Sequence, residues 1–335
     1  MSSPALTLHS RPRPLAARDL DRVVWIDASL RGRTRRAYFE RRLAAAARDP
    51  DRHLQLGVET DGRLAGHMLG RALEGEFGRT EPEVRLEAFG VVGPAQGEGL
   101  GAALLKAFED EAARRGLRQV RTTALWREHA LLAFFDRAGF QLSPVHVLDC
   151  ALDEAELGSA REAPVEPAPG PADPNDYGTP RPADFAPLAR DAVEIGILSQ
   201  ADLEGVARID RRHTGRDRRG YLCRTVAEAL ADSALRVSLA ARVDRSVAGY
   251  VMARLDYGDF GRAEPVAVID TIGVDPLRAH QGVGRAMLSQ LFANLAALGV
   301  ERVETVVAPG DLGLLGFFYA AGFRPSERVS FVKQL

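Results

Sequence analysis

Cysteine is scarce in this sequence of 335 residues, and neither sign of charge dominates it. The two cysteines, Cys150 and Cys223, form no Cys-x-x-Cys pair, which argues against a disulfide framework or a metal site and fits a reducing cytosol. A formal net charge of −2 gives no support for binding nucleic acid or an anionic membrane. No run approaches the roughly 20 apolar residues of a membrane span, and the first 20 residues lack the apolar core of a signal peptide. We therefore expect a cytoplasmic protein with no metal, nucleic acid or membrane partner.

An internal repeat at an offset of 183 residues is the main feature that the sequence does contain. The matching segments include Gly32-Arg33 with Gly215-Arg216, Phe77-Gly78-Arg79 with Phe260-Gly261-Arg262, Gly99-Leu100-Gly101 with Gly282-Val283-Gly284, and Phe134-Phe135 with Phe317-Phe318. Solenoid repeats recur at roughly 20 to 50 residues, so this longer period indicates a duplicated domain. A hydrophobic fraction of 46% is sufficient for two buried cores.

A stretch rich in proline, alanine, glycine and glutamate separates the two copies, over residues 153–191. It shows no hydrophobic period, and closely spaced prolines exclude a helix or a central strand. We read it as an extended linker. The expected organisation is a first domain at 1–152, a linker at 153–191 and a second domain at 192–335.

Each copy reads as alternating helices and strands. Two helices flank an arginine-rich segment, and two strands follow, joined in the first copy by Asp61-Gly62, a favoured hairpin turn. A further strand then runs through a glycine-rich turn into a helix, and a strand, a helix and a final strand complete the copy. This order predicts an α/β fold with a mixed sheet in each domain.

The glycine-rich turns read Gln96-Gly-Glu-Gly-Leu-Gly101 and Ala279-His-Gln-Gly-Val-Gly284. A strand, a glycine turn and a helix together form an anion-binding junction, because glycines admit a ligand close to the backbone and the helix N–H groups favour phosphate. Neither turn matches the Gly-x-Gly-x-x-Gly pattern of dinucleotide-binding folds, and neither has the Gly-Lys-Ser/Thr of a Walker loop.

Gln96-x-x-Gly99-x-Gly101 followed by Phe134-Phe-Asp-Arg-Ala-Gly-Phe140 resembles the GCN5-related N-acetyltransferase (GNAT) superfamily, and the second copy is similar. The resemblance implies two tandem GNAT-like domains, with acetyl-CoA as co-substrate. Its pyrophosphate would lie on the turn and its pantetheine arm along the preceding strand. The implied binding residues are Phe89, Val91, Gln96, Gly97, Glu98, Gly99, Leu100 and Gly101 in the first copy, and Ile272, Val274, Ala279, His280, Gln281, Gly282, Val283 and Gly284 in the second.

The sequence departs from the family pattern at two places. The position that opens the turn holds Gln96 in the first copy but Ala279 in the second, which predicts weaker binding there. The family often uses a tyrosine in the last helix to protonate the leaving thiolate, but here that position holds Phe135 and Phe318. Tyr319 is adjacent and points about 100° away. Either water protonates the thiolate or the sites are slow.

Glu87 and Asp270 are equivalent carboxylates on the strand before each turn. An amine must lose a proton to accept an acyl group, and a carboxylate commonly takes it. These two acids are the candidate catalytic residues, as a general base or as an anchor for the substrate amine. The alternative is a strand residue that faces solvent or a neighbouring arginine.

The arginine-rich segment supplies the candidate acceptor-binding residues, which are Arg33, Arg36, Tyr38, Arg216, Arg219 and Tyr221. Arginine binds carboxylates and phosphates, so an acidic group on the acceptor or a CoA phosphate would fit. The alternative is a solvated helix start with an arginine paired to Asp27 or Asp210.

The resemblance predicts an acetyl-CoA-dependent N-acetyltransferase (EC 2.3.1.-), in which the primary amine of a small molecule or a peptide attacks the thioester directly. Two alternatives stay open. One is a non-catalytic acyl-CoA-binding or regulatory protein, and the other is an acetylase of protein N-termini or lysines. The sequence does not identify the acceptor or the active copy, and it does not distinguish a monomer from a homodimer.

Overall fold

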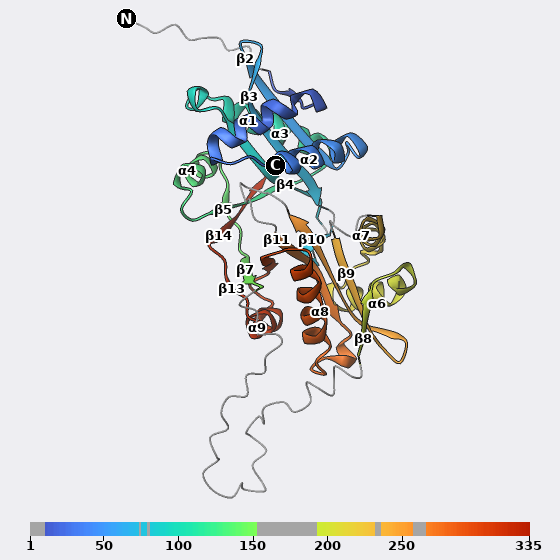
Figure 1. The fold of residues 1–335 in the computed structure, drawn as a ribbon. Helices are drawn as coiled ribbons and strands as arrows, with labels where there is room; N and C mark the ends of the chain where they lie inside the picture. Colours follow the sequence, from blue (N-terminus) through green and yellow to red (C-terminus); the bar gives the residue numbers. More distant parts are fainter. Residues whose placement is uncertain (1–10, 74, 79–80, 153–192, 232–235, 257–265) are drawn as a thin grey trace, which may run out of the picture. The chain divides into compact units, whose positions relative to one another are not determined.

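The computed structural model describes residues 11–73, 75–78, 81–152, 193–231, 236–256 and 266–335, which form two compact units (Figure 1). Each unit is built around one mixed sheet with helices packed on it. The α/β fold expected from the order of elements is therefore confirmed. The expected linker, 153–191, lies outside the described residues.

The first unit contains the sheet β1-β2-β3-β4-β5-β14-β6 among the described residues. Its elements are β1 (Arg13–Pro14), α1 (Leu20–Arg31), α2 (Arg36–Arg48), β2 (His53–Thr60), β3 (Arg63–Leu73), β4 (Glu83–Val91), α3 (Leu100–Arg114), β5 (Gln119–Leu125), α4 (His129–Arg137), β6 (Gln141–Leu142) and β14 (Arg328–Gln334). Strands β4 and β5 are parallel, and β2, β3 and β4 pair in antiparallel fashion.

The second unit repeats this plan with the sheet β13-β7-β12-β11-β10-β9-β8 in the part of the chain that the structure describes. Its elements are β7 (His146–Ala151), β8 (Glu194–Ile197), α6 (Leu203–Thr214), α7 (Arg219–Ala231), β9 (Arg236–Val243), β10 (Ser246–Asp256), β11 (Val266–Val274), α8 (Val283–Ala297), β12 (Arg302–Val307), α9 (Leu312–Ala320) and β13 (Arg324–Pro325). Strands β11 and β12 are its parallel pair.

The final strand of each repeat lies in the sheet of the other unit. Strand β14 pairs with β5 in antiparallel register, with Ser330 opposite Thr123 and Phe331 opposite Thr122, while β7 lies between β13 and β12. The order of elements predicted that each copy keeps its own final strand. The structure differs because both sheets present the same edge, so either final strand satisfies either sheet. The two units are consequently not contiguous in sequence.

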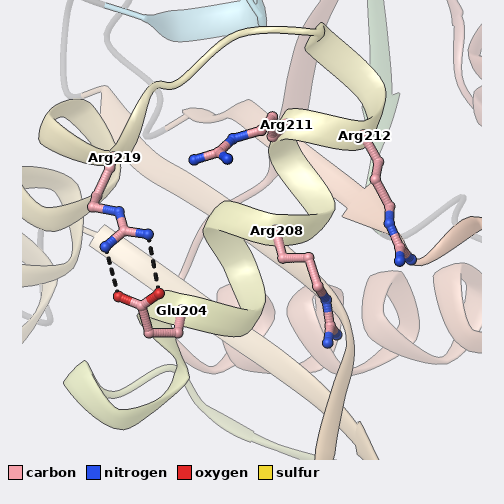
Figure 2. A pocket seen from close by; sticks show the side chains of 5 residues that line it. All are labelled: Glu204, Arg208, Arg211, Arg212 and Arg219. Carbon is pink, nitrogen blue, oxygen red and sulfur yellow. Dashed lines mark hydrogen bonds and ion pairs between the residues drawn. The ribbon is translucent and has the colours of Figure 1, made fainter.

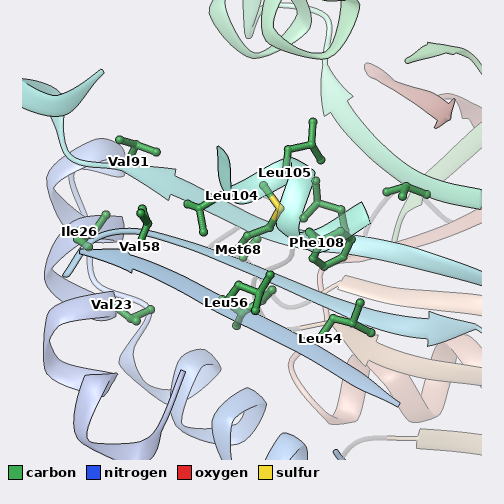
Figure 3. Close-up of a cluster of buried hydrophobic side chains, with 14 of the residues drawn as sticks. Val23, Ile26, Leu54, Leu56, Val58, Met68, Val91, Leu104, Leu105 and Phe108 are labelled. Carbon is green, nitrogen blue, oxygen red and sulfur yellow. The ribbon is translucent and has the colours of Figure 1, made fainter. Parts of the chain in front are cut away.

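The core of the first unit gathers buried side chains from α1, from strands β2 to β4 and from α3 (Figure 3). Ile26, Met68, Leu104 and Phe108 are all fully buried. Burying one such side chain contributes about 1.5–3 kcal/mol. Gly70 makes room for Phe108, because a Cβ atom there would lie 2.4 Å from the tip of the phenyl ring.

The hairpin predicted at Asp61-Gly62 joins β2 to β3. Both residues have positive φ, 52° and 73°, as a two-residue hairpin turn with a matching twist requires. In the second unit Asp244 and Arg245 adopt φ of 52° and 63° without a glycine. The strand pairing therefore imposes the turn there, although the local sequence favours it less.

Candidate functional site

Two parallel strands separate at the same place in each unit. Strand β4 pairs with β5 from Glu83 to Arg85 and then continues alone along that edge to Val91. In the second unit, β11 and β12 pair from Val266 to Ile269, and β11 continues to Val274. The last part of β4 and of β11 therefore lacks a parallel partner strand among the described residues.

Threonine hydroxyls mark the start of the separation. Thr122 donates to the Leu86 carbonyl at 3.3 Å, and Thr305 donates to the Ile269 carbonyl at 3.0 Å. These residues are equivalent in the repeat, so a side chain takes over one strand carbonyl in both units.

The turn after β4 presents backbone N–H groups at the start of α3. Gly97 and Gly99 have φ of 85° and 84°, a left-handed conformation that glycine adopts without strain. No side chain caps the helix at Gly99, and the first intrahelical bond runs from the Ala103 N–H to the Gly99 carbonyl. The N–H groups before Ala103 therefore point out of the helix end, where the helix dipole favours an anion.

The second turn follows the same path with less favourable residues. His280 has φ of 61° and Gly282 has φ of 78°. A left-handed conformation costs a non-glycine residue roughly 1–2 kcal/mol. In the first turn the Gln96 side chain also donates to the Val91 carbonyl at 3.0 Å, a bond that Ala279 cannot make. The first turn thus has less backbone strain than the second, and the Gln96 side chain ties it to the preceding strand.

The last glycine of each turn serves packing. Phe89 stacks on Phe134 with ring centroids 4.9 Å apart, and a Cβ atom at Gly101 would lie 3.0 Å and 3.3 Å from these rings. At Gly284 a Cβ atom would lie 3.0 Å from Phe317. Any larger residue would push the helix away from the aromatic side chain.

The remaining predicted cofactor-binding residues lie at the same junctions. Leu100 and Val283 are buried beneath the helix starts, while Glu98 and Gln281 are exposed in the turns. On the strands leading in, Val91 is buried, and Ile272 and Val274 are partly buried. The structure therefore places the predicted residues of each copy along one strand, one turn and one helix start.

Glu87 lies at a bulge in β4, where the register with β3 shifts between Leu69 and Gly70. Its carboxylate is buried, and it meets Arg42 at 3.2 Å and Arg71 at 3.4 Å. Of the alternatives left open for this strand residue, the structure excludes a solvent-facing side chain and shows arginine partners.

Asp270 lies at the matching bulge of β11, where the register with β10 shifts between Met252 and Ala253. It is buried and pairs with Arg236 at 3.0 Å, and Arg236 also pairs with Glu228 at 2.9 Å. Both candidate acids therefore have arginine partners inside their own unit. Their catalytic roles stay predictions.

A buried ion pair anchors the arginine-rich segment of each unit. Arg35 donates to Asp27 through Nε at 2.8 Å and through Nη2, and Arg218 donates to Asp210 in the same two-point manner, with Nε at 3.0 Å. The arginine paired to Asp27 or Asp210, weighed as the structural alternative, is thus present in both copies.

The predicted acceptor residues separate into two groups. Arg33, Arg36, Arg216 and Arg219 are exposed. Arg36 pairs with Asp21 and Glu40, and Arg219 pairs with Glu204 at 2.7 Å. The tyrosines are buried, and the Tyr221 hydroxyl lies 3.0 Å from the hydroxyl of Thr271, the residue after Asp270. The structure therefore brings Tyr221, but not Arg219, to the strand that carries the candidate acid.

One buried polar position was not identified as a candidate from the sequence. Tyr250 donates to Asp210 at 2.8 Å, and the equivalent position of the first copy holds His67, which is fully buried. Burial lowers the pKa of His67 to about 4. The pairing of His67 with Tyr250 at the repeat offset was the available signal.

The last helix supplies no phenol to the junction. Phe135 and Phe318 are buried in the two cores, whereas Tyr319 is 40% exposed. That Tyr319 points away from the family position stays a prediction, and its exposure agrees with it. Among the described residues no helix is long and apolar enough to cross a membrane, and no three His, Cys, Asp or Glu side chains are grouped to hold a metal ion.

The chain is similar in sequence or in fold to proteins that are described as acetyltransferases or GNAT proteins. A Clavibacter michiganensis subsp. michiganensis mycothiol acetyltransferase is 34% identical over 110 residues, a match that spans 33% of each chain. A tandem GNAT protein from the clavulanic acid biosynthesis pathway is 18% identical, with 96% of this chain and 98% of that chain covered and a TM-score of 0.60. The GCN5-related glucosamine N-acetyltransferase region of a fungal multi-domain GH3 β-N-acetylglucosaminidase is 13% identical, with a TM-score of 0.64, and it matches 99% of this chain but 39% of that one.

The profile of the acetyltransferase (GNAT) family matches residues 18–140 and 206–323, once in each repeat and over more than half of the chain. Two matches in one chain agree with the two sheets and with the tandem structural neighbour. The chain belongs to the acetyltransferase (GNAT) family and carries two tandem GNAT domains.

Proposed function

We propose that this protein transfers the acetyl group of acetyl-CoA to a primary amine. The observation that carries the proposal is the junction of separating parallel strands and an uncapped glycine turn, which occurs in both units. Acetyl-CoA supplies an activated acyl group as a thioester. The 34% identity to a mycothiol acetyltransferase supports acetyl transfer as the reaction class and leaves the acceptor open.

Two parts of the junction fit acetyl-CoA. The N–H groups around Gly97 to Gly101 favour a pyrophosphate, because they stand at an uncapped helix start and the glycines let the ligand approach the backbone. Strand β4 beyond Arg85 offers backbone groups that pair with the amides of the pantetheine arm, in the manner of an added strand. In the second unit Ile272, Val274 and the turn from Ala279 to Gly284 would act in the same way.

The transfer forms one C–N bond and breaks one C–S bond. The neutral amine attacks the thioester carbonyl, the thiolate leaves, and the amine loses a proton. Glu87 and Asp270 are the proposed proton acceptors or ammonium anchors, directly or through water, because each lies on the separating strand at a bulge. Water protonates the thiolate, since Phe135 and Phe318 stand where the family often has tyrosine.

The arginine partners of the two acids set a condition on that role. Arg42 and Arg71 stabilise the Glu87 carboxylate, and Arg236 stabilises that of Asp270. An ammonium anchor needs this negative charge, whereas a base works better when it is less stabilised. The kinetic constants separate the two roles, because loss of an ammonium anchor raises the KM for the amine, whereas loss of a base lowers kcat.

The test measures acetyl-CoA binding and free thiol release on the whole chain, because cutting the linker would take a strand from both sheets. Calorimetric titration is expected to show one or two sites, and a panel of amines is expected to include one that releases thiol. Binding without thiol release for any amine would instead favour the non-catalytic acyl-CoA-binding alternative. Release with peptides alone would favour a protein N-terminal or lysine acetylase. Absence of binding at high micromolar acetyl-CoA would overturn the proposal.

A further inference from the structure

Helix α6 of the second unit carries a group of arginines that the proposed reaction does not use. Arg208, Arg211 and Arg212 lie on it at a spacing that places them on neighbouring positions of the helix surface. Together with Glu204 and with Arg219 from α7 they line a pocket (Figure 2). Four guanidinium groups and one carboxylate therefore line this hollow.

The repeat shows that the fold does not require this charge. At the positions of Arg208, Arg211 and Arg212 the first copy has Trp25, Ala28 and Ser29. The ion pair between α6 and α7, from Glu204 to Arg219, does have an equivalent in the pair of Asp21 with Arg36. The second copy thus carries three arginines on a helix pair whose equivalent in the first copy folds without them.

The arginine side chains are accessible, with between 42% and 56% of each exposed. Their carboxylate partners differ in burial, because Glu204 and Asp217 are exposed whereas Asp275 is buried. Arg211 meets Asp217 at 3.3 Å, while Arg212 and Arg208 share Asp275 at 2.7 Å and 3.5 Å. The exposed ion pairs of Arg211 with Asp217 and of Arg219 with Glu204 are weak and exchange readily with a better anion.

The charge of a ligand group determines which class of anion binds these arginines best. The protein already offers these arginines the carboxylates of Glu204, Asp217 and Asp275, so a ligand carboxylate adds nothing that they lack. A phosphate group carries up to two charges and presents several oxygens to the planar guanidinium forks. A phosphorylated ligand can therefore replace the surface pairs where a carboxylic acid cannot.

We infer that the pocket of Glu204, Arg208, Arg211, Arg212 and Arg219 binds the phosphate groups of a small molecule. This is a second site in addition to the proposed acetyl transfer. The phosphate can belong to a separate ligand or to the CoA molecule bound at the second turn, since Arg212 and Arg208 pair with Asp275 directly after β11.

The test compares the whole protein with the variant Arg211→Ala/Arg212→Ser, which installs the residues of the first copy and leaves both glycine turns intact. Calorimetric titration with inorganic pyrophosphate is expected to show a dissociation constant at least tenfold higher for the variant, since charge-assisted hydrogen bonds are lost. The matched control is Arg114→Ala/Arg127→Ser, which removes two arginines that are 73% and 76% exposed elsewhere. It is expected to leave pyrophosphate affinity within twofold.

Acetyl-CoA titration of the same variant separates the two sources. Unchanged affinity for acetyl-CoA with weakened pyrophosphate binding assigns the pocket to a separate phosphorylated ligand. A parallel loss assigns it to the phosphates of CoA. Equal pyrophosphate affinity in the wild type and the variant would overturn the inference, as would an equal loss in the control. A lower melting temperature with unchanged pyrophosphate affinity would also overturn it and show that the arginines only stabilise the end of α6.

Discussion

Tyr250 donates its phenolic proton to Asp210 at 2.8 Å in the second unit. His67 holds the same repeat position in the first unit, yet neither of its ring nitrogens has a hydrogen-bond partner among the described residues. The residue that packs against this position, on helix α2, also differs between the two copies. Phe39 packs edge-on to His67 with centroids 5.4 Å apart, whereas the second copy has Leu222 at that position. The two units thus fill equivalent positions with different side-chain pairs, His67 with Phe39 in the first and Tyr250 with Leu222 in the second.

The first prediction concerns acid stability of the first unit. Burial lowers the pKa of His67 to about 4 from an unfolded value of about 6.5. Between these values the unfolded chain binds the proton and the folded chain does not, so stability is lost as the pH falls from 6.5 to 4. The loss amounts to about 3 kcal/mol from this one group. Urea unfolding followed by tryptophan fluorescence reports it, since both tryptophans, Trp25 and Trp126, lie in the first unit.

The variant His67→Tyr/Phe39→Leu is the matched control for this effect, because it installs the two side chains that the second copy has at these positions. Other groups titrate in the same range, so the informative quantity is the difference in unfolding free energy between wild type and variant. That difference is expected to change by about 3 kcal/mol across the window. A constant difference would show that His67 does not cause the acid sensitivity.

The second prediction separates two neighbouring arginines. Arg35→Ala leaves the buried carboxylate of Asp27 without its partner and is expected to destabilise the first unit by about 3–5 kcal/mol. Arg36→Ala removes an exposed side chain and is expected to leave the melting temperature unchanged. Scanning calorimetry measures both. A large loss for Arg36→Ala would point to a role that its surface ion pairs do not explain.

The third prediction identifies the catalytic unit. Glu87→Gln and Asp270→Asn keep the size of the side chain and remove the charge. The substitution in the catalytic unit is expected to lower kcat by roughly 10² to 10⁴, and the other is expected to leave it within twofold. Acetyl-CoA binding is measured on both variants to show that each still folds, because each removes one carboxylate partner of a buried arginine. Full turnover by both variants would remove these residues from the mechanism.

The fourth prediction tests the turns. Gly99→Ala forces a side chain into a φ of 84° at the start of α3 and is expected to abolish acetyl-CoA binding at the first turn. Gly116→Ala is the control, since Gly116 has a φ of 75° at the other end of the helix and faces open space. Both should lose roughly 1–2 kcal/mol of stability. Calorimetric titration is expected to show fewer sites for Gly99→Ala alone, and equal affinities in the two variants would contradict the role of the turn.

The fifth prediction tests the exchanged strands. Phe331 packs against Phe135 with centroids 5.5 Å apart, so Phe331→Ala is expected to destabilise the first unit by about 3–5 kcal/mol. Leu148, its repeat equivalent, is buried in the second unit. Leu148→Ala should therefore leave the tryptophan-detected transition in place while lowering the overall melting temperature. The reverse pattern would indicate that each repeat keeps its own strand.

Local chemistry made part of this fold predictable. The hairpin at Asp61-Gly62 and the turn at Gly97 and Gly99 require positive φ, and in this copy glycine stands at three of these four positions. The repeat offset then transferred each assignment to the other copy. Helices and strands with a clear hydrophobic period followed from the same reasoning.

What the sequence left undecided depends on contacts between distant residues. Arg35 and Arg36 are adjacent, yet one reaches a buried carboxylate and the other faces solvent, which only the direction of α2 decides. The bulges at Glu87 and Asp270 depend on the register of a partner strand. The exchanged strands were hidden because two similar sheets accept either one.

The position of β14 also constrains how the protein is made. Arg328 donates to Thr123 at 3.0 Å across 205 positions of sequence. Domains usually fold in the order of their synthesis, the N-terminal one first. Here the first sheet stays incomplete until the ribosome has delivered residues 328–334, after nearly all of the second repeat. The pairing of β14 with β5 is therefore one of the last native contacts to form, and contacts so distant in sequence form slowly.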